Sequence, residues 1–242
     1  MKSRSIDLLV IAFTLLLLSA VIVNALPGGP DSITGGKSER RTENNTGVAV
    51  PALAGNVTAL DIVGSSITKF WQGYFGNISG TVQLSDANNN SLYNWAAASP
   101  SGEIYASRNQ QISWNNNIGC ANSSTRNSEN TFLGSDSTNI SDNLNLTFDR
   151  PDHPNFFVGS MLMVGCNSTS VNAAGTGAIF WESLLQENTT GTMVYASQIQ
   201  QDTAGFDGGV HDFQMLVGEP GSGAQTFPAG TTTTYYFFVE LG

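Results

Sequence analysis

Apolar residues are arranged in two different ways along this chain. Near the start they form one block, because Leu8 to Val23 is a 16-residue run that is apolar except for Thr14 and Ser19. From residue 56 onward, apolar and polar residues alternate in short segments, which is typical of β-strands. The pattern therefore predicts a leader followed by a β-rich body.

The first block has the layout of a secretory signal peptide. Lys2 and Arg4 precede the apolar run, and Val23 and Ala25 supply small residues at the −3 and −1 positions of a cleavage site. A membrane span is the competing interpretation, but the run is short of the roughly 20 residues that a span needs, and no basic cluster follows it. A pilin-type leader would carry a glycine before the apolar run. We predict a signal peptide over 1–25, a secreted protein at the cell surface, and no membrane span in the mature chain.

Residues 26–55 are predicted to form a flexible N-terminal arm. Gly, Pro, Ser and charged residues dominate 26–47, and this composition does not support a packed core. The arm ends in a short apolar segment, 48–54, which Pro51 interrupts; proline is tolerated at the edge of a sheet but not at its centre. This segment is either a strand donated to another molecule or, with the residues up to 63, the first strand of its own sheet.

Residues 56–242 are predicted to form a single all-β domain, a β-sandwich or jelly roll. Many short strand candidates recur between turn residues, as in sandwich folds. They lie at 66–75, 77–84, 91–95, 103–107, 111–114, 145–148, 156–166, 178–185, 192–199, 211–217 and 233–240. The polar stretch 121–143 is predicted to be a surface loop. Aromatic residues in the strands are expected to fill the core rather than to form an exposed platform for sugars.

Charge excludes two classes of partner. The chain has a net charge of −10, and removal of the leader leaves 7 basic and 18 acidic residues, a net charge of −11. Such an acidic surface disfavours nucleic acid and anionic lipid. Only 12% of the residues are charged, so solubility has to come from Asn, Ser, Thr and Gly, or from attached sugar.

Two kinds of covalent modification are predicted. Cys120 and Cys166 are the only cysteines, and in an oxidising compartment they are expected to form one disulfide rather than remain two buried thiols. Nine Asn-x-Ser/Thr sequons predict covalent N-glycans, about double the four or five expected by chance, although Asn, Ser and Thr also favour turns. The sequons are at Asn44, Asn56, Asn77, Asn89, Asn122, Asn139, Asn145, Asn167 and Asn188.

The chain lacks a convincing pattern for catalysis, and we predict no enzyme activity, cofactor or metal. His153 and His211 are far apart in sequence and have no zinc-ligand spacing. A calcium site and an Asx turn are both compatible with oxygen ligands at alternate positions in Asp86-x-Asn88-x-Asn90, and the turn is the commoner explanation. The carboxylates available for a glycosidase pair are Glu103, Glu182, Glu187 and Asp212.

Three segments carry a resemblance. WQGYFGNISG at 71–80, LYNW at 92–95 and PSGEIYA at 100–106 are similar to segments of uncharacterised secreted β-sandwich surface proteins of archaea, over about residues 55–120. The general layout also resembles archaeal surface-filament subunits, in which an N-terminal extension of one subunit completes the sheet of the next. The resemblance implies a structural protein and transfers no catalytic residues.

The predicted function is therefore that of a structural subunit of an extracellular filament or surface coat. Its partners would be copies of itself, joined head to tail, with Val48, Val50 and Leu53 as the inserted side chains of the donor strand. The alternative is a monomeric carbohydrate-binding or adhesive surface domain. A jelly-roll glycosidase is a third and weaker hypothesis.

Overall fold

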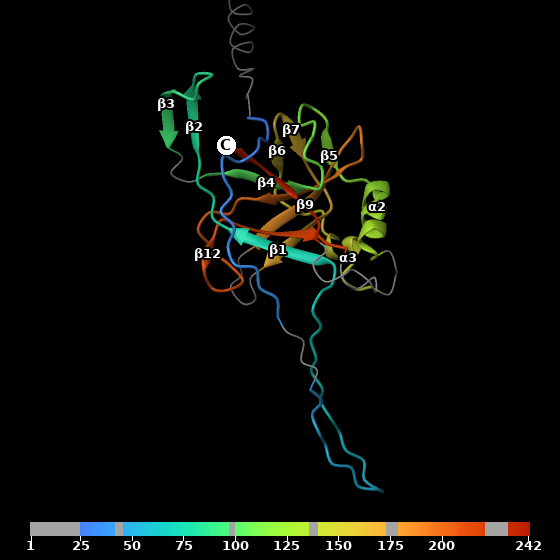
Figure 1. Ribbon diagram of the computed structural model, residues 1–242. Helices are drawn as coiled ribbons and strands as arrows, with labels where there is room; N and C mark the ends of the chain where they lie inside the picture. Colours follow the sequence, from blue (N-terminus) through green and yellow to red (C-terminus); the bar gives the residue numbers. More distant parts are fainter. Residues whose placement is uncertain (1–24, 42–45, 97–99, 136–139, 173–178, 221–231) are drawn as a thin grey trace, which may run out of the picture.

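The computed structural model describes residues 25–41, 46–96, 100–135, 140–172, 179–220 and 232–242 (Figure 1). The predicted signal peptide, apart from Ala25, lies outside the described residues, as do Asn44 and Asn139. The structure is mainly β, with several antiparallel sheets, which confirms the predicted all-β class. Among the described residues, no helix has the length and apolar character needed to cross a membrane.

A six-stranded antiparallel sheet forms the centre of the molecule. Its path is β14-β4-β10-β9-β5, and β8 pairs with the same strand β9. One edge of strand β9 pairs with β10. Along its other edge, β8 pairs with the first five residues of β9 and β5 with the last three. The bounds are β14 Tyr236–Leu241, β4 Gly102–Ser107, β10 Met193–Gln198, β9 Ile179–Glu187, β5 Ile118–Cys120 and β8 Ser168–Asn172.

Both faces of the central sheet are buried. Successive side chains of a strand point to opposite faces, so Leu184 and Tyr195 enter one core cluster while Leu185 and Val194 enter the other. A two-stranded sheet of β1 (Trp71–Gly76) and β13 (Phe213–Gly218) covers the first face, and a hairpin of β6 (Phe156–Val158) and β7 (Met161–Met163) covers the second. The strands are thus not divided into two sheets of similar size, and the predicted sandwich or jelly roll is not confirmed.

The predicted surface loop 121–143 is wrong, because it contains a helix. Helix α2 spans Ser123–Leu133; the Asn122 side chain caps its first turn, and Gly134, with a φ of 69°, ends it in the left-handed region. Leu133 is fully buried. A second short helix, α3 (Leu144–Thr147), occupies the predicted strand 145–148.

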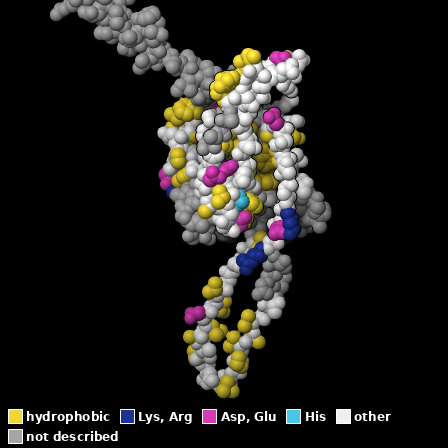
Figure 2. All heavy atoms as spheres, turned by 90° about the vertical axis from the view of Figure 1, so that its left-hand side faces the viewer, with side chains coloured by type: hydrophobic (Ala, Val, Ile, Leu, Met, Phe, Trp, Pro, Cys, Tyr) yellow, Lys and Arg dark blue, Asp and Glu magenta, His cyan; other side chains and the backbone are white. Residues whose placement is uncertain are grey.

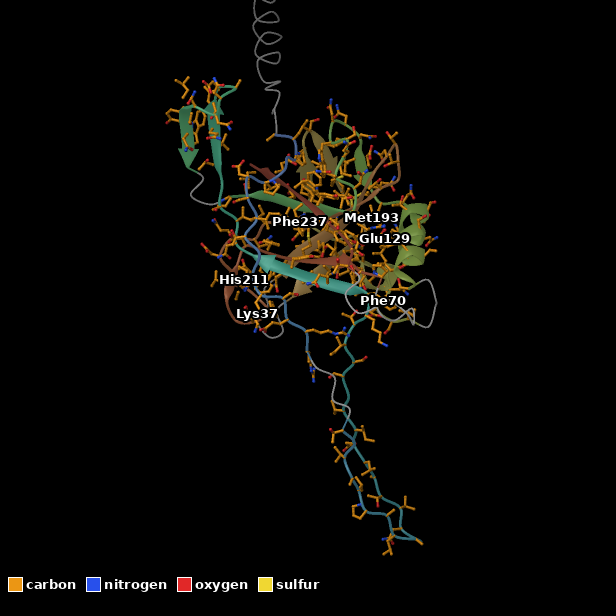
Figure 3. All side chains as sticks on the ribbon, viewed as in Figure 1. Lys37, Phe70, Glu129, Met193, His211 and Phe237 are labelled. Atoms are coloured by element: carbon orange, nitrogen blue, oxygen red, sulfur yellow. A yellow bond between two sulfur atoms is a disulfide. The ribbon has the colours of Figure 1, made fainter. Side chains whose placement is uncertain are left out.

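Polar side chains fix α2 against the sheet. Glu129 of α2 accepts a hydrogen bond from the Tyr195 hydroxyl at 3.0 Å and forms an ion pair with Arg108. Glu129 lies beside Met193 of β10, with which it lines a shallow polar depression (Figure 3). The local sequence of α2 is polar, so these long-range contacts, rather than an apolar stripe, hold the helix in place.

Two further hairpins lie at the periphery of the molecule. Strands β11 (Thr203–Ala204) and β12 (Val210–His211) form a short one, in which Asp207 accepts a hydrogen bond from His211 at 2.9 Å. Strands β2 (Thr81–Ser85) and β3 (Ser91–Ala96) form a longer one that projects from the body (Figure 1).

Candidate functional site

Residues 46–66, named here the projecting loop, leave the body as one long excursion and return to it before β1 (Figure 1). The chain reverses direction where the Asn56 amide donates to the Leu53 carbonyl at 3.2 Å, and Gly55 has a φ of 89°. The excursion therefore has an outgoing limb before Leu53 and a return limb after Asn56. Neither limb contains a strand, including the segment 57–62 in which alternation suggested one.

The projecting loop is apolar and exposed. Its large apolar side chains are between 52% and 101% exposed, and Asp61 is its one charged residue. These side chains are Val48, Val50, Leu53, Val57, Leu60, Ile62 and Val63. A contiguous exposed apolar patch of this kind marks an interaction surface in a protein that has to stay soluble.

The three predicted donor residues lie on the outgoing limb. Val48, Val50 and Leu53 belong to neither core cluster of the described residues and lie in no strand, so the structure does not make them part of a first strand of its own sheet. The return limb adds Val57, Leu60 and Ile62, which the sequence prediction assigned to the body. Their alternation with polar residues was visible in the sequence, but it did not reveal that no core covers them.

The β2–β3 hairpin presents a second uncovered apolar surface. In its register Val82 faces Trp95 and Leu84 faces Tyr93, so these four side chains share one face, named here the hairpin face. Each of the four is about half exposed. Gln83 and Asn94 pair on the opposite face. The hairpin is therefore amphipathic, although neither of its faces belongs to either core cluster.

The hairpin turn is an Asx turn. The Asp86 carboxylate accepts hydrogen bonds from the amides of Asn88 and Asn90, at 2.9 and 2.8 Å, and from the Asn90 side chain. These bonds lower the pKa of Asp86. Asn89 has a φ of 62°, a conformation that asparagine tolerates well. The carboxylate oxygens are thus engaged by the turn itself. Within the described residues, no three His, Cys, Asp or Glu side chains are grouped to hold a metal ion.

The projecting loop and the hairpin lie at opposite ends of the molecule. Figure 1 shows the loop below the body and the hairpin above it. In the view turned by 90°, apolar side chains gather on the loop at the bottom and on the hairpin at the top (Figure 2). One chain thus carries two apolar extensions that point away from each other.

Two other strand edges of the described residues are less suited to binding a partner. Strand β1 pairs with β13 alone among the described strands, but its side chains are already packed: Trp71 on Phe148 and Tyr74 on Phe237, with ring centroids 5.6 and 5.1 Å apart. The outer edge of β14 is partly occupied, because Gly28 exchanges two backbone hydrogen bonds with Val239, at 3.0 and 2.8 Å.

The predicted disulfide is confirmed. Cys120, at the end of β5, is bonded to Cys166, which lies between β7 and β8 and is fully buried. The bond joins the central sheet to the segment that covers its second face. His153 is buried beside it, and its Nε2 accepts the Cys166 amide at 2.9 Å.

Six of the sequon asparagines within the described residues are exposed: Asn56, Asn77, Asn89, Asn122, Asn145 and Asn188. Asn56 lies at the tip of the projecting loop and Asn89 in the hairpin turn. Asn167 differs, because it is half-buried and its Nδ2, the atom that would carry a glycan, donates to the Phe148 carbonyl at 2.9 Å. Asn122 acts as the helix cap described above.

Two of the four carboxylates named for a glycosidase pair, Glu182 and Asp212, have a structural role. Glu182 is fully buried, and its Oε2 accepts the Leu216 amide of β13 at 2.8 Å. Burial raises its pKa. Asp212 is buried and accepts the amides of Ile78 and Asp202 at 2.7 and 3.0 Å. These two groups hold backbone amides of neighbouring segments and do not face a cleft.

No family model, no curated protein and no solved structure matches this chain.

Proposed function

We propose that this protein is a secreted, glycosylated structural subunit of an extracellular filament or surface coat, polymerising by donation of its N-terminal segment. The observation that carries the proposal is the projecting loop, whose seven large apolar side chains have no cover within the described chain. This feature favours copies of the same chain as partners. The extended segment of one copy would bind the next copy through backbone pairing and side-chain pockets.

The energetics agree with donation of a strand. Burial of a large aliphatic side chain contributes roughly 1.5–3 kcal/mol, so seven of them offer a gross gain on the order of 10 kcal/mol or more. Association itself costs about 4–15 kcal/mol. The free energy gained by side-chain burial is therefore similar to the free energy that association costs. The backbone hydrogen bonds of an added strand would make assembly favourable.

Separation of the two apolar extensions supports a linear polymer. A contact between two different surfaces of one chain is head-to-tail, and it continues as a fibre unless its rotation closes a ring. The net negative charge disfavours nucleic acid as a partner, and contact between copies would fall on the two apolar extensions, where Asp61 and Asp86 are the only charged residues. The chain has few charged residues to keep it soluble, and N-glycans on the exposed sequons would add to its solubility.

Electron microscopy and sedimentation of the secreted protein test this proposal. We expect the wild type to form fibres, and we expect the combined substitution Val48→Ser, Val50→Ser and Leu53→Ser to leave it monomeric. Leu162→Ser is the control, because Leu162 is a half-exposed apolar residue on β7, away from the loop. Monomeric wild type at high concentration, or fibres unaffected by the triple substitution, would contradict the proposal.

A monomeric carbohydrate-binding domain is the second candidate. The observation that favours it is the pair of exposed rings on the hairpin face, Tyr93 and Trp95, with centroids 4.4 Å apart. Exposed aromatic side chains can pack on the apolar faces of sugars. Binding of the monomer to an array of glycans, lost in Trp95→Ala but kept in Asn94→Ala, would favour this candidate.

A further inference from the structure

We infer that the hairpin face of one copy is the receptor for the projecting loop of the next copy. The inference rests on the proposed function and specifies the acceptor surface, which donation of a strand alone leaves open. It concerns Val82, Leu84, Tyr93 and Trp95, together with the outer edges of β2 and β3.

The β2–β3 hairpin lacks the contacts that would make it stable on its own. An isolated two-stranded hairpin is marginally stable in water, and a third strand or a packed face is required for independent stability. Strands β2 and β3 pair with each other and with no other described strand. A strand added at one of their edges, with its apolar side chains on the hairpin face, would supply both the third strand and the packed face.

The other edges offer less. Pairing at β1 would bury little apolar surface, because Trp71 and Tyr74 already pack against aromatic rings of their own chain. Pairing at β14 would have to displace the two hydrogen bonds of Gly28. At the hairpin, by contrast, an incoming strand meets four half-exposed apolar side chains.

The return limb of the projecting loop fits this surface. Residues 57–63 contain neither glycine nor proline, and seven residues match the usual length of a strand. In an extended conformation Leu60 and Ile62 point to one face, whereas Asp61 points to the other together with Val57 and Val63. The side with Leu60 and Ile62 can therefore meet the hairpin face while the Asp61 carboxylate stays in water. The only charged residue of the hairpin, Asp86, is in the turn, away from the paired residues.

The position of the two surfaces makes the contact intermolecular. The projecting loop points away from the end of the molecule that carries the hairpin in both views (Figures 1 and 2). A loop that reaches the hairpin of a second copy leaves that copy's own loop free for a third. The same contact repeated would build the fibre.

Single-cysteine cross-linking tests this contact directly. Both native cysteines are in the disulfide, so an introduced cysteine is the only free thiol. One full-length variant carries Leu60→Cys or Ile62→Cys in the loop, and a second, differently tagged variant carries Leu84→Cys or Trp95→Cys on the hairpin face. After co-assembly and mild oxidation, we expect a disulfide-linked heterodimer for at least one of the four combinations. Its yield should be at least tenfold above that with the matched control Gln83→Cys, which lies on the opposite face of the same hairpin.

Four results would overturn the inference. Two come from the single-cysteine variants: equal yields for the two hairpin faces, and cross-links confined to loop–loop pairs. The third is an intrachain disulfide in a further variant, one chain that carries both Leu60→Cys and Leu84→Cys. The fourth is binding of a glycan to the hairpin face in the assembled protein.

A second measurement separates the inference from the proposed function. The combined substitution Val82→Ser and Trp95→Ser should reduce polymer formation at least tenfold, while Gln83→Ser and Asn94→Ser should not. If fibres form, depend on the loop and survive the hairpin-face substitutions, the acceptor lies elsewhere and the proposed function stands. If the wild type forms no fibres at all, the proposed function and the inference both fail.

Discussion

Glu103 and Glu240 are directly opposite each other on β4 and β14, although both are carboxylic acids. Both are buried. Tyr105 donates its hydroxyl hydrogen to one oxygen of Glu240 at 2.9 Å, and the Gly159 amide donates to the other at 2.9 Å. Burial, and then the charge of Glu240, raise the pKa of Glu103 to about 8. Glu103 therefore holds its proton at neutral pH, which lets the two carboxyl groups share this site.

We expect this pair to make stability depend on pH. Folded Glu103 keeps a proton that the unfolded chain loses above pH 4.5, so the free energy of unfolding falls as pH rises from about 4.5 to about 8. The contribution is at most about 1.4 kcal/mol per pH unit. Urea unfolding at pH 5, 6.5 and 8 should show a shallower fall for Glu103→Gln than for the wild type. An exposed control, Asp149→Asn, should keep the wild-type slope, and identical slopes in all three proteins would contradict this account.

Residue patterns alone identified some of these positions and missed others. The cysteine pair and the Asx turn at Asp86 follow from local sequence and from the expected compartment, and the structure contains both. The buried carboxylates could not be predicted, because the pKa of Glu103 is raised by burial, and then by Glu240, a neighbour 137 positions away, and neither is visible in the local sequence. The burial of His153 likewise depends on a contact that its neighbouring residues do not indicate, the hydrogen bond with the Cys166 amide.

At the scale of elements, the disulfide joins two parts of the structure that are far apart in the sequence. It links β5 to the segment between β7 and β8 across a sequence separation of 46 residues. Closing a loop of that length restricts the unfolded chain and contributes about 3–4 kcal/mol in the chain-entropy description.

Replacing both cysteines should therefore lower the free energy of unfolding by about 3–4 kcal/mol in urea. Because the bond is remote from the projecting loop and the hairpin, the Cys120→Ala, Cys166→Ala protein should still assemble under conditions in which it stays folded. A loss below 1 kcal/mol would show that the disulfide does not constrain the unfolded chain as described.

Strands were easier to predict than their partners. The segments 103–107, 192–199 and 233–240 nearly coincide with β4, β10 and β14, because apolar residues bounded by turn residues mark a buried strand locally. Helix α2 was missed because Asn, Ser and Thr dominate it, and its place is set by Glu129 and Leu133 through contacts with distant residues. The layering was missed for the same reason: a strand sequence does not reveal what covers each of its faces.

At the scale of the whole molecule, the apolar surface is divided between an interior and two extensions. The interior fills both faces of the central sheet, whereas the projecting loop and the hairpin face lie outside it at opposite ends. Alternation in the sequence marked residues 57–62 and 91–95 as extended segments, but only the structure separates a strand of the body from one that lacks cover.

Hydrogen–deuterium exchange tests most directly whether the projecting loop is a donated strand. The exchange rates of the loop amides are compared between the native secreted material and the Val48→Ser, Val50→Ser, Leu53→Ser protein. If the loop is a donated strand, the amides of residues 48–63 should exchange at least tenfold more slowly in the wild-type material than in the monomeric variant. Exchange of these amides at the rate of an unstructured peptide in both proteins would contradict the account.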